Sequence, residues 1–269
     1  MNEFGPLRGA QSRRAALRTI GFALAASAWP RPLSATPDEA AKALSALTGD
    51  AAVKPGKVAL SLPEMAADSA NVPVTVEVES PMTEQNHVTA IHVLAENNPF
   101  AELISFRLTP AAGKADVATR IRLRESQNVV AAAVFNDGSV YAVKRKIVVT
   151  SGGCGVEGTG EASAVPPKPE PKIRIARQGA LYEVKTLVTH EMETGLRKDK
   201  SGTPIPRQIL RGFVCKIAGK LVFEATFHPG TSANPFLAFH ARPEAGGAFE
   251  FVWTEDSGRT IVERREVKG

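Results

Sequence analysis

The chain has 269 residues, of which 43% are hydrophobic and 23% are charged, a balance typical of globular domains rather than of disordered or collagen-like chains. Two cysteines are too few for a disulfide-rich scaffold. The formal net charge is +5, but residues 1–35 hold five arginines and one glutamate, or +4, which leaves +1 for residues 36–269 and argues against a basic surface for nucleic acid or acidic lipid.

The first segment, residues 1–35, has the order of an export signal. A pair of arginines at residues 13–14 precedes a short apolar run at residues 20–26, and small residues follow the run. The run is too short to span a bilayer of about 30 Å at 1.5 Å per residue. The sequence therefore predicts a twin-arginine-type signal, cleaved after Ala35 or Ala28, and a mature protein in the bacterial periplasm; an uncleaved amphipathic anchor is the alternative.

One short helix is expected after the signal, over residues 38–47, with Asp38 as its cap and Gly49 near its end. The apolar pattern then changes to the period of two that is typical of strands. Residues 136–138, Asn-Asp-Gly, predict a tight hairpin turn because the glycine accepts a positive φ. Seven short strands at this spacing indicate an immunoglobulin-like antiparallel β-sandwich over residues 36–150. The strands are expected at residues 58–62, 72–78, 88–94, 103–108, 117–123, 128–134 and 139–149.

Residues 151–171 interrupt the strands with a glycine-rich and then a proline-rich stretch, which predicts a linker. Tight turns are expected at residues 218–219 and 256–258. The predicted fold class is all-β, with two immunoglobulin-like antiparallel β-sandwich domains, the second at residues 172–269, a Gly/Pro-rich linker and a short N-terminal helix. The strands of the second domain are expected at residues 172–176, 181–188, 210–217, 220–227, 235–241, 248–253 and 259–263.

Two sets of motifs make the chain similar to a known pair of proteins. The first set resembles SoxY, the cysteine-bearing subunit of the bacterial sulfur-oxidation carrier, and lies at residues 80–84, 91–93, 97–99, 118–123 and 148–155. The second set resembles the partner subunit SoxZ and lies at residues 190–199, 205–206 and 234–237. The chain thus resembles a single-chain SoxY–SoxZ fusion, with the interface of the two subunits made intramolecular.

The resemblance implies a covalent substrate carrier, without catalysis, metal or cofactor of its own, that holds sulfur intermediates on Cys154. The implied partners are periplasmic enzymes: SoxAX attaches thiosulfate to the thiol, SoxB hydrolyses off sulfate, and a sulfane dehydrogenase oxidises the remaining sulfur. Fused carriers of this kind also occur with quinoprotein dehydrogenases, so a different cargo is an alternative. Val156 replaces the last glycine of the family's Gly-Gly-Cys-Gly-Gly arm, and here the arm continues into the linker.

The residues around Cys154 suit a carrier arm. Gly152, Gly153 and Gly155 remove side-chain bulk next to the thiol and widen the backbone conformations open to it. Such an arm can insert a thiol into a narrow pocket, where the visiting enzyme supplies the charges that stabilise the thiolate. A structural disulfide or an idle thiol is the alternative.

The second cysteine and the histidines favour ordinary packing. Cys215 alternates with Phe213 and Ile217 in a predicted strand, so it is expected to face the core. No sequence motif of a serine hydrolase, a P-loop or a dinucleotide-binding turn is present. The five histidines lack metal-ligand spacing and are expected to be packed or surface residues: His87, His92, His190, His228 and His240.

A charged segment at residues 190–207 is the remaining candidate. Arg197 and Lys198 stand in it between two glycines, which favours either a solvated loop or a rigid docking surface whose charges steer partner enzymes. Two further functions compete with the carrier. One is a structural or interaction protein of tandem immunoglobulin-like domains, and the other is a redox chaperone that pairs Cys154 with Cys215.

Overall fold

The computed structural model describes residues 35–150, 169–242 and 247–267. In the first half the elements are α1 (Pro37–Thr48), β1 (Val53–Lys54), β2 (Val58–Ser61), β3 (Met65–Ala66), β4 (Val72–Val78), β5 (Val88–Ala95), β6 (Glu102–Leu108), the 3-10 turn η1 (Pro110–Ala112), β7 (Ala115–Ile121), β8 (Gln127–Phe135) and β9 (Val140–Val149). In the second half they are β10 (Pro171–Gln178), β11 (Leu181–Val188), β12 (Leu210–Ile217), β13 (Lys220–Phe227), β14 (Phe236–Ala241), β15 (Gly247–Glu255) and β16 (Thr260–Val267).

The predicted helix is confirmed, but its predicted cap is wrong. Thr36 is the N-cap: its hydroxyl accepts a hydrogen bond from the Glu39 backbone N at 3.2 Å, and the Glu39 carboxylate accepts one from the Thr36 backbone N at 2.8 Å. Pro37 suits the first helical position because it has no N–H to leave unpaired. Asp38 instead lies in the first turn, where its negative charge interacts favourably with the partial positive charge of the helix N-terminus.

The predicted all-β class is confirmed, with two sheets and one short helix near the N-terminus. One sheet has the strand order β1-β9-β8-β5-β6-β13-β12-β15-β16, with β3 added beside β9, and the other has the order β10-β11-β14-β7-β4-β2. The strands expected in each half are present, within a few residues of their predicted ends. Their side chains alternate between buried and more exposed, as in β7 and β11, because one face of each strand packs on the core.

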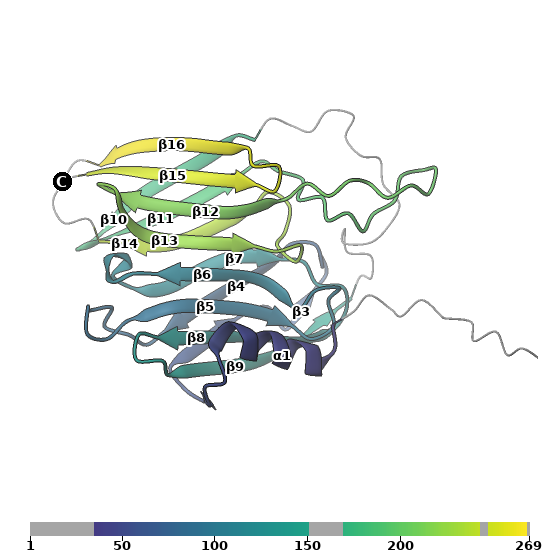
Figure 1. Ribbon diagram of the computed structural model, residues 1–269, viewed down its shortest axis with the longest axis horizontal. Helices are drawn as coiled ribbons and strands as arrows, with labels where there is room; N and C mark the ends of the chain where they lie inside the picture. Colours follow the sequence, from purple (N-terminus) through teal and green to yellow (C-terminus); the bar gives the residue numbers. More distant parts are fainter. Residues whose placement is uncertain (1–34, 151–168, 243–246, 268–269) are drawn as a thin grey trace, which may run out of the picture. The chain divides into compact units, whose positions relative to one another are not determined.

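Both sheets contain strands from both halves of the chain (Figure 1). In the larger sheet, β6 pairs antiparallel with β13, from Ile104 opposite Phe227 to Leu108 opposite Phe223. In the smaller sheet, β7 pairs with β14. The two halves are therefore joined by backbone hydrogen bonds edge to edge, an arrangement that the pattern of each half does not reveal.

An aromatic cluster fills the core at this junction. The rings of Phe223 and Phe239 stack with centroids 4.1 Å apart, and Phe106 from the first half lies 5.7 Å from Phe223. Each such side chain, when fully buried, contributes about 2 to 3 kcal/mol to folding. Cys215 is fully buried in the same core, which confirms the prediction, and burial raises the pKa of its thiol. Among the described helices, none has the length and apolar character needed to cross a bilayer.

Candidate functional site

Cys154 and its neighbours Gly152, Gly153 and Gly155 lie outside the described residues. The structure describes the two points from which that stretch of chain departs and to which it returns. β9 ends at Val149, and Thr150 is the last described residue before Cys154, four positions upstream of it. We call this end of β9, together with β3, the arm base.

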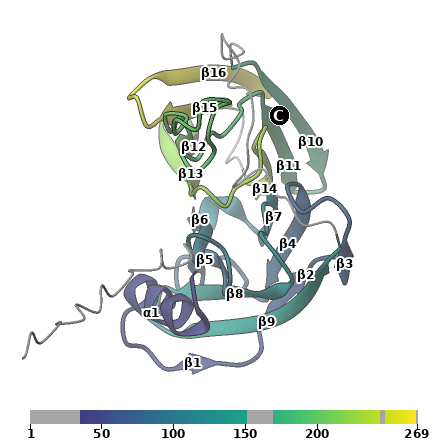
Figure 2. The ribbon, with the colours of Figure 1, turned by 90° about the vertical axis from the view of Figure 1, so that its right-hand side faces the viewer.

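Backbone hydrogen bonds hold the arm base on one side. β3 pairs in parallel with the end of β9, with Met65 beside Val148 and Ala66 beside Val149. The Val148 N donates to the Glu64 carbonyl at 2.9 Å, and the Thr150 N donates to the Ala66 carbonyl at 3.1 Å. Figure 2 shows β1 and β3 along β9, where β1 pairs with its start and β3 with its end. The chain is therefore fixed up to Thr150.

A side chain from another turn holds the opposite side of the arm base. The Ser126 hydroxyl accepts a hydrogen bond from the Val149 N at 2.9 Å. Ser126 belongs to the turn between β7 and β8, residues 122–126. On the return side, the Thr189 N donates to the Glu170 carbonyl at 3.4 Å, and Pro171 pairs with Val188. Both ends of the stretch that contains Cys154 are thus attached to sheets.

Arg122 connects that same turn to the charged segment of the second half. Its side chain is buried, at 5% exposure, and its guanidinium donates to the Met192 carbonyl at 3.0 Å and to the Glu191 carbonyl at 2.9 Å. Its own carbonyl accepts a hydrogen bond from the Asn98 amide at 2.7 Å. Three sequence motifs that lie far apart in the chain, at residues 97–99, 118–123 and 190–199, therefore meet beside the arm base.

His190 anchors the start of the charged segment. Its Nδ1 accepts a hydrogen bond from the Met192 N at 3.0 Å, and its Nε2 lies 3.3 Å from a carboxylate oxygen of Glu255. Burial lowers the pKa of His190, and the Glu255 carboxylate only partly opposes this. Burial acts to raise the pKa of Glu255, but hydrogen bonds from Arg259 and Ser257 outweigh it and the net shift is downward. His190 is therefore a neutral packing residue that fixes the backbone.

The charged segment, between β11 and β12, projects from the sheets as a loop (Figure 1). The Arg197 guanidinium donates to the Glu193 carboxylate at 2.7 Å, and the Arg197 carbonyl accepts from the Ile205 N at 2.9 Å. The Asp199 carboxylate accepts hydrogen bonds from the backbone and hydroxyl groups that follow it, and these lower its pKa. Of the two predicted docking residues, Arg197 is engaged by Glu193, whereas the side chain of Lys198 is exposed.

A hollow of about 510 Å³ lies over the pairing of β5, β6 and β13, on the seam of the two halves. The His92 Nδ1 lies 2.8 Å from the Ser105 hydroxyl, and the His228 Nε2 lies 3.3 Å from a Glu102 oxygen. Burial, and then the neighbouring charge of His228, lower the pKa of His92 to about 4. No group of three or more His, Cys, Asp or Glu side chains within the described ranges could hold a metal ion.

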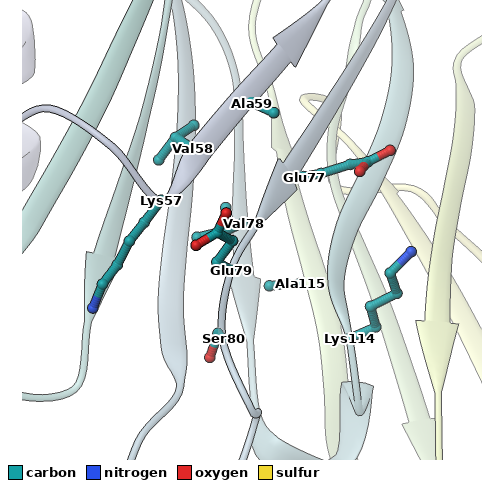
Figure 3. A pocket seen from close by; sticks show the side chains of 9 residues that line it. All are labelled: Lys57, Val58, Ala59, Glu77, Val78, Glu79, Ser80, Lys114 and Ala115. Carbon is teal, nitrogen blue, oxygen red and sulfur yellow. The ribbon is translucent and has the colours of Figure 1, made fainter.

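A second hollow, of about 410 Å³, lies beside β2, β4 and the start of β7 (Figure 3). Glu77 and Lys114 stand on one side of it, with Lys57 on the other. The Lys114 ammonium is held by the Asp116 carboxylate at 2.8 Å, which raises the pKa of the lysine. Because lysines and glutamates both line this hollow, its charge selects no class of ligand.

Two parts of the site carry little sequence signal. β3 has two residues, too few for a period-two pattern, so Met65 was not predicted to lie beside the arm base. Arg122 stands in one of the quoted motifs, but its reach to carbonyl groups about 70 positions away depends on tertiary structure.

Family models match two separate stretches of the chain. Residues 44–154 match Sulfur oxidation protein SoxY, and residues 172–266 match Sulphur oxidation protein SoxZ. No curated protein sequence matches. Among solved structures, the sulfur carrier protein SoxY from Chlorobium limicola f thiosulfatophilum is 27% identical, with a TM-score of 0.36, over 41% of this chain and 96% of that one. A superoxide reductase (neelaredoxin) from Ignicoccus hospitalis is 20% identical, with a TM-score of 0.33, over 44% of this chain and 96% of that one.

Proposed function

Because the chain joins a SoxY domain to a SoxZ domain and so belongs to the SoxYZ sulfur-oxidation carriers, we propose that it holds sulfur intermediates as covalent adducts of Cys154 and presents them to a series of enzymes. The observation that carries the proposal is that the SoxY match ends at Cys154. The arm base supports it, since β9 is held on both sides up to Thr150 and so gives the thiol a fixed starting point.

The other cysteine does not suit this role. Cys215 is fully buried, and burial raises the pKa of its thiol, so the thiolate needed for nucleophilic attack is suppressed. A disulfide between Cys154 and Cys215 would require Cys215 to leave an aromatic core, which disfavours the redox-chaperone alternative. Cys154 is the only other thiol in the sequence.

The proposed chemistry takes place on the carrier thiol and in the partner's active site. In the first step the Cys154 sulfur forms a bond with the terminal sulfur of thiosulfate; the thiol loses its proton, and two electrons pass to a SoxAX-type heme enzyme. In the second step a SoxB-type hydrolase uses water to break the bond between the sulfane sulfur and the sulfonate, releasing sulfate and leaving a persulfide on Cys154. A sulfane dehydrogenase then oxidises the outer persulfide sulfur to a sulfonate, with oxygen from three water molecules and six electrons passing to the enzyme, and a second hydrolysis releases sulfate and restores the thiol. The carrier contributes attachment and position and no catalytic group.

The length of the stretch around Cys154 sets how it can be presented. Four residues beyond Thr150 can extend about 14 Å, and the eighteen residues between Thr150 and Pro169 about 60 Å. In the sequence, Cys154 therefore belongs to a segment that is joined to a sheet at both ends, rather than to a chain terminus. Partner pockets must be open-sided to admit such a segment, unless the chain is cut downstream of Cys154.

The proposal places the carrier in the periplasm, exported by the twin-arginine route. The paired arginines and the short apolar run in residues 1–35 support this. SoxAX-, SoxB- and sulfane dehydrogenase-type enzymes would then be its partners. In a quinoprotein dehydrogenase system the same thiol would carry a different cargo.

Intact-mass analysis of the protein purified from its own periplasm tests the proposal. During growth on thiosulfate we expect adducts of sulfane and thiosulfate groups on Cys154, and a mature N-terminus near residue 29 or 36. Cys154→Ser should abolish the adducts, while the matched variant Cys215→Ala should keep them. Unmodified Cys154 in cells that are oxidising thiosulfate, or adducts that persist in Cys154→Ser, would overturn the assignment.

A further inference from the structure

Two apolar side chains are exposed side by side at the arm base. Met65 in β3 is 62% exposed and Val148 in β9 is 39% exposed, and the parallel register places the two residues next to each other. Their neighbours Ala66 and Val149 turn the other way, and Ala66 is buried. Backbone pairing, the Ser126 hydroxyl and the inward side chains of Ala66 and Val149 hold this short ladder, so polar residues would fit at the two outward positions equally well.

The short distance in sequence between this pair and Cys154 indicates which part of a partner enzyme can come near the pair. Val148 stands six residues before Cys154, so the thiol lies within about 20 Å of it along the chain. The rim of an enzyme pocket that closes over Cys154 is therefore within reach of the ladder of β3 and β9. Both side chains would lose exposed apolar area if that rim covered them, which favours the contact.

The side chains at this short ladder indicate what kind of partner surface they would contact. Methionine is flexible and polarizable, and it adapts to differently shaped partners, as a carrier that visits several enzymes requires. Lys146 lies two residues before Val148 on the same face of β9, and its side chain is exposed. Glu64, which directly precedes Met65, is exposed as well, so charges of both signs border the pair and the contact itself is apolar.

We propose that Met65 and Val148 form the contact on which each partner enzyme seats the apolar rim of its thiol-accepting pocket. The inference rests on the proposed carrier function and extends it to the surface outside the arm. The contact acts on binding of the carrier body and leaves the reactivity of the thiol itself unchanged.

The test uses the full-length mature protein with Cys154 loaded with a thiosulfate group, and a purified SoxB-type hydrolase as the probe enzyme. Sulfate release is measured against carrier concentration for the wild type and for the double variant Met65→Ser, Val148→Thr. We expect the KM for the carrier to rise at least tenfold and kcat to stay within twofold, because the bound thiol still reaches the same active site. Val262→Thr is the matched control, since Val262 is also an exposed valine, at 53%, on the distant edge strand β16.

The outcomes separate this inference from the function on which it rests. If loaded wild type releases no sulfate, the carrier function fails; if it releases sulfate and the double variant has an unchanged KM, the docking contact is refuted. Reaction of unloaded Cys154 with a small maleimide should proceed at one rate in all variants. Should the double variant fold poorly, Met65→Ala and Met65→Leu decide the matter, because only the alanine variant should raise KM.

Discussion

We predict that His92, at the seam between the two halves, makes the free energy of unfolding depend on pH. Its imidazole, 7% exposed, is bonded to the Ser105 hydroxyl in the hollow over β5, β6 and β13, and burial lowers its pKa from 6.5 to about 4. The unfolded chain therefore takes up a proton at this residue more readily than the folded protein. The stability that neutral His92 provides is complete above pH 6.5 and is lost as the pH falls from 6.5 through about 4.

The size of the loss follows from the two pKa values. A difference of about 2.5 units corresponds to about 3 kcal/mol in full, of which about 2 kcal/mol is lost by pH 5. His92→Gln removes the titration while keeping an amide that can bond to Ser105. His190, whose pKa is also lowered, remains in both proteins, so its contribution cancels in the comparison. The charge of His228 helps to lower the pKa of His92, so the difference between the two proteins reports on this pair of histidines together.

Urea unfolding at pH 8, 7, 6 and 5 measures the free energy of unfolding of the wild type and of His92→Gln. We expect the wild type to lose about 2 kcal/mol more than the variant between pH 8 and pH 5, whatever their absolute stabilities. Keeping the pH at 5 or above limits the contribution of buried carboxylates such as Glu255. Parallel curves for the two proteins would show that His92 is not held neutral by burial.

Three further substitutions test the junction and the loop. Arg122→Ala leaves the Met192 and Glu191 carbonyls without their donor and should cost about 3 kcal/mol in urea unfolding, with faster amide exchange in the charged loop; exchange confined to other regions would contradict this. Phe223→Ala should cost about 3 to 5 kcal/mol, because it opens a cavity between both halves, and a loss below 1 kcal/mol would show that the halves pack independently. Lys198→Ala should leave stability within about 0.5 kcal/mol while weakening partner binding in a salt-dependent way; unchanged binding at low salt would remove Lys198 from the docking surface.

The alternation of apolar residues was sufficient to predict where the strands lie, but it did not show which strands pair with each other. Alternation in β12 predicted a buried Cys215, because burial of every second residue is a property of one strand facing one core. The pairing of β6 with β13 is different. Each strand alternates in the same way whichever edge it joins, and the contact of Phe106 with Phe223 in a shared core is not recorded in the pattern of either strand.

The other features that sequence analysis missed are either too short to show a pattern or depend on tertiary structure. The cap at Thr36 was assigned to Asp38 because both residue types favour helix starts, and only the bonds between Thr36 and Glu39 distinguish them. β3 is held by two backbone bonds rather than by a hydrophobic repeat. The role of Arg122 depends on where the loop after β11 returns, which no local pattern records.

Because both sheets contain strands from both halves of the chain, they also determine what state the protein would have after cleavage by a protease. Cleavage anywhere between Thr150 and Pro169 would break the polypeptide but none of the ladders that join β6 to β13 and β7 to β14. The nicked molecule would run as two pieces in detergent and as a single particle on gel filtration, much as two separately encoded subunits would. One scission would thus give the segment that bears Cys154 a free end, without loosening the body that carries it.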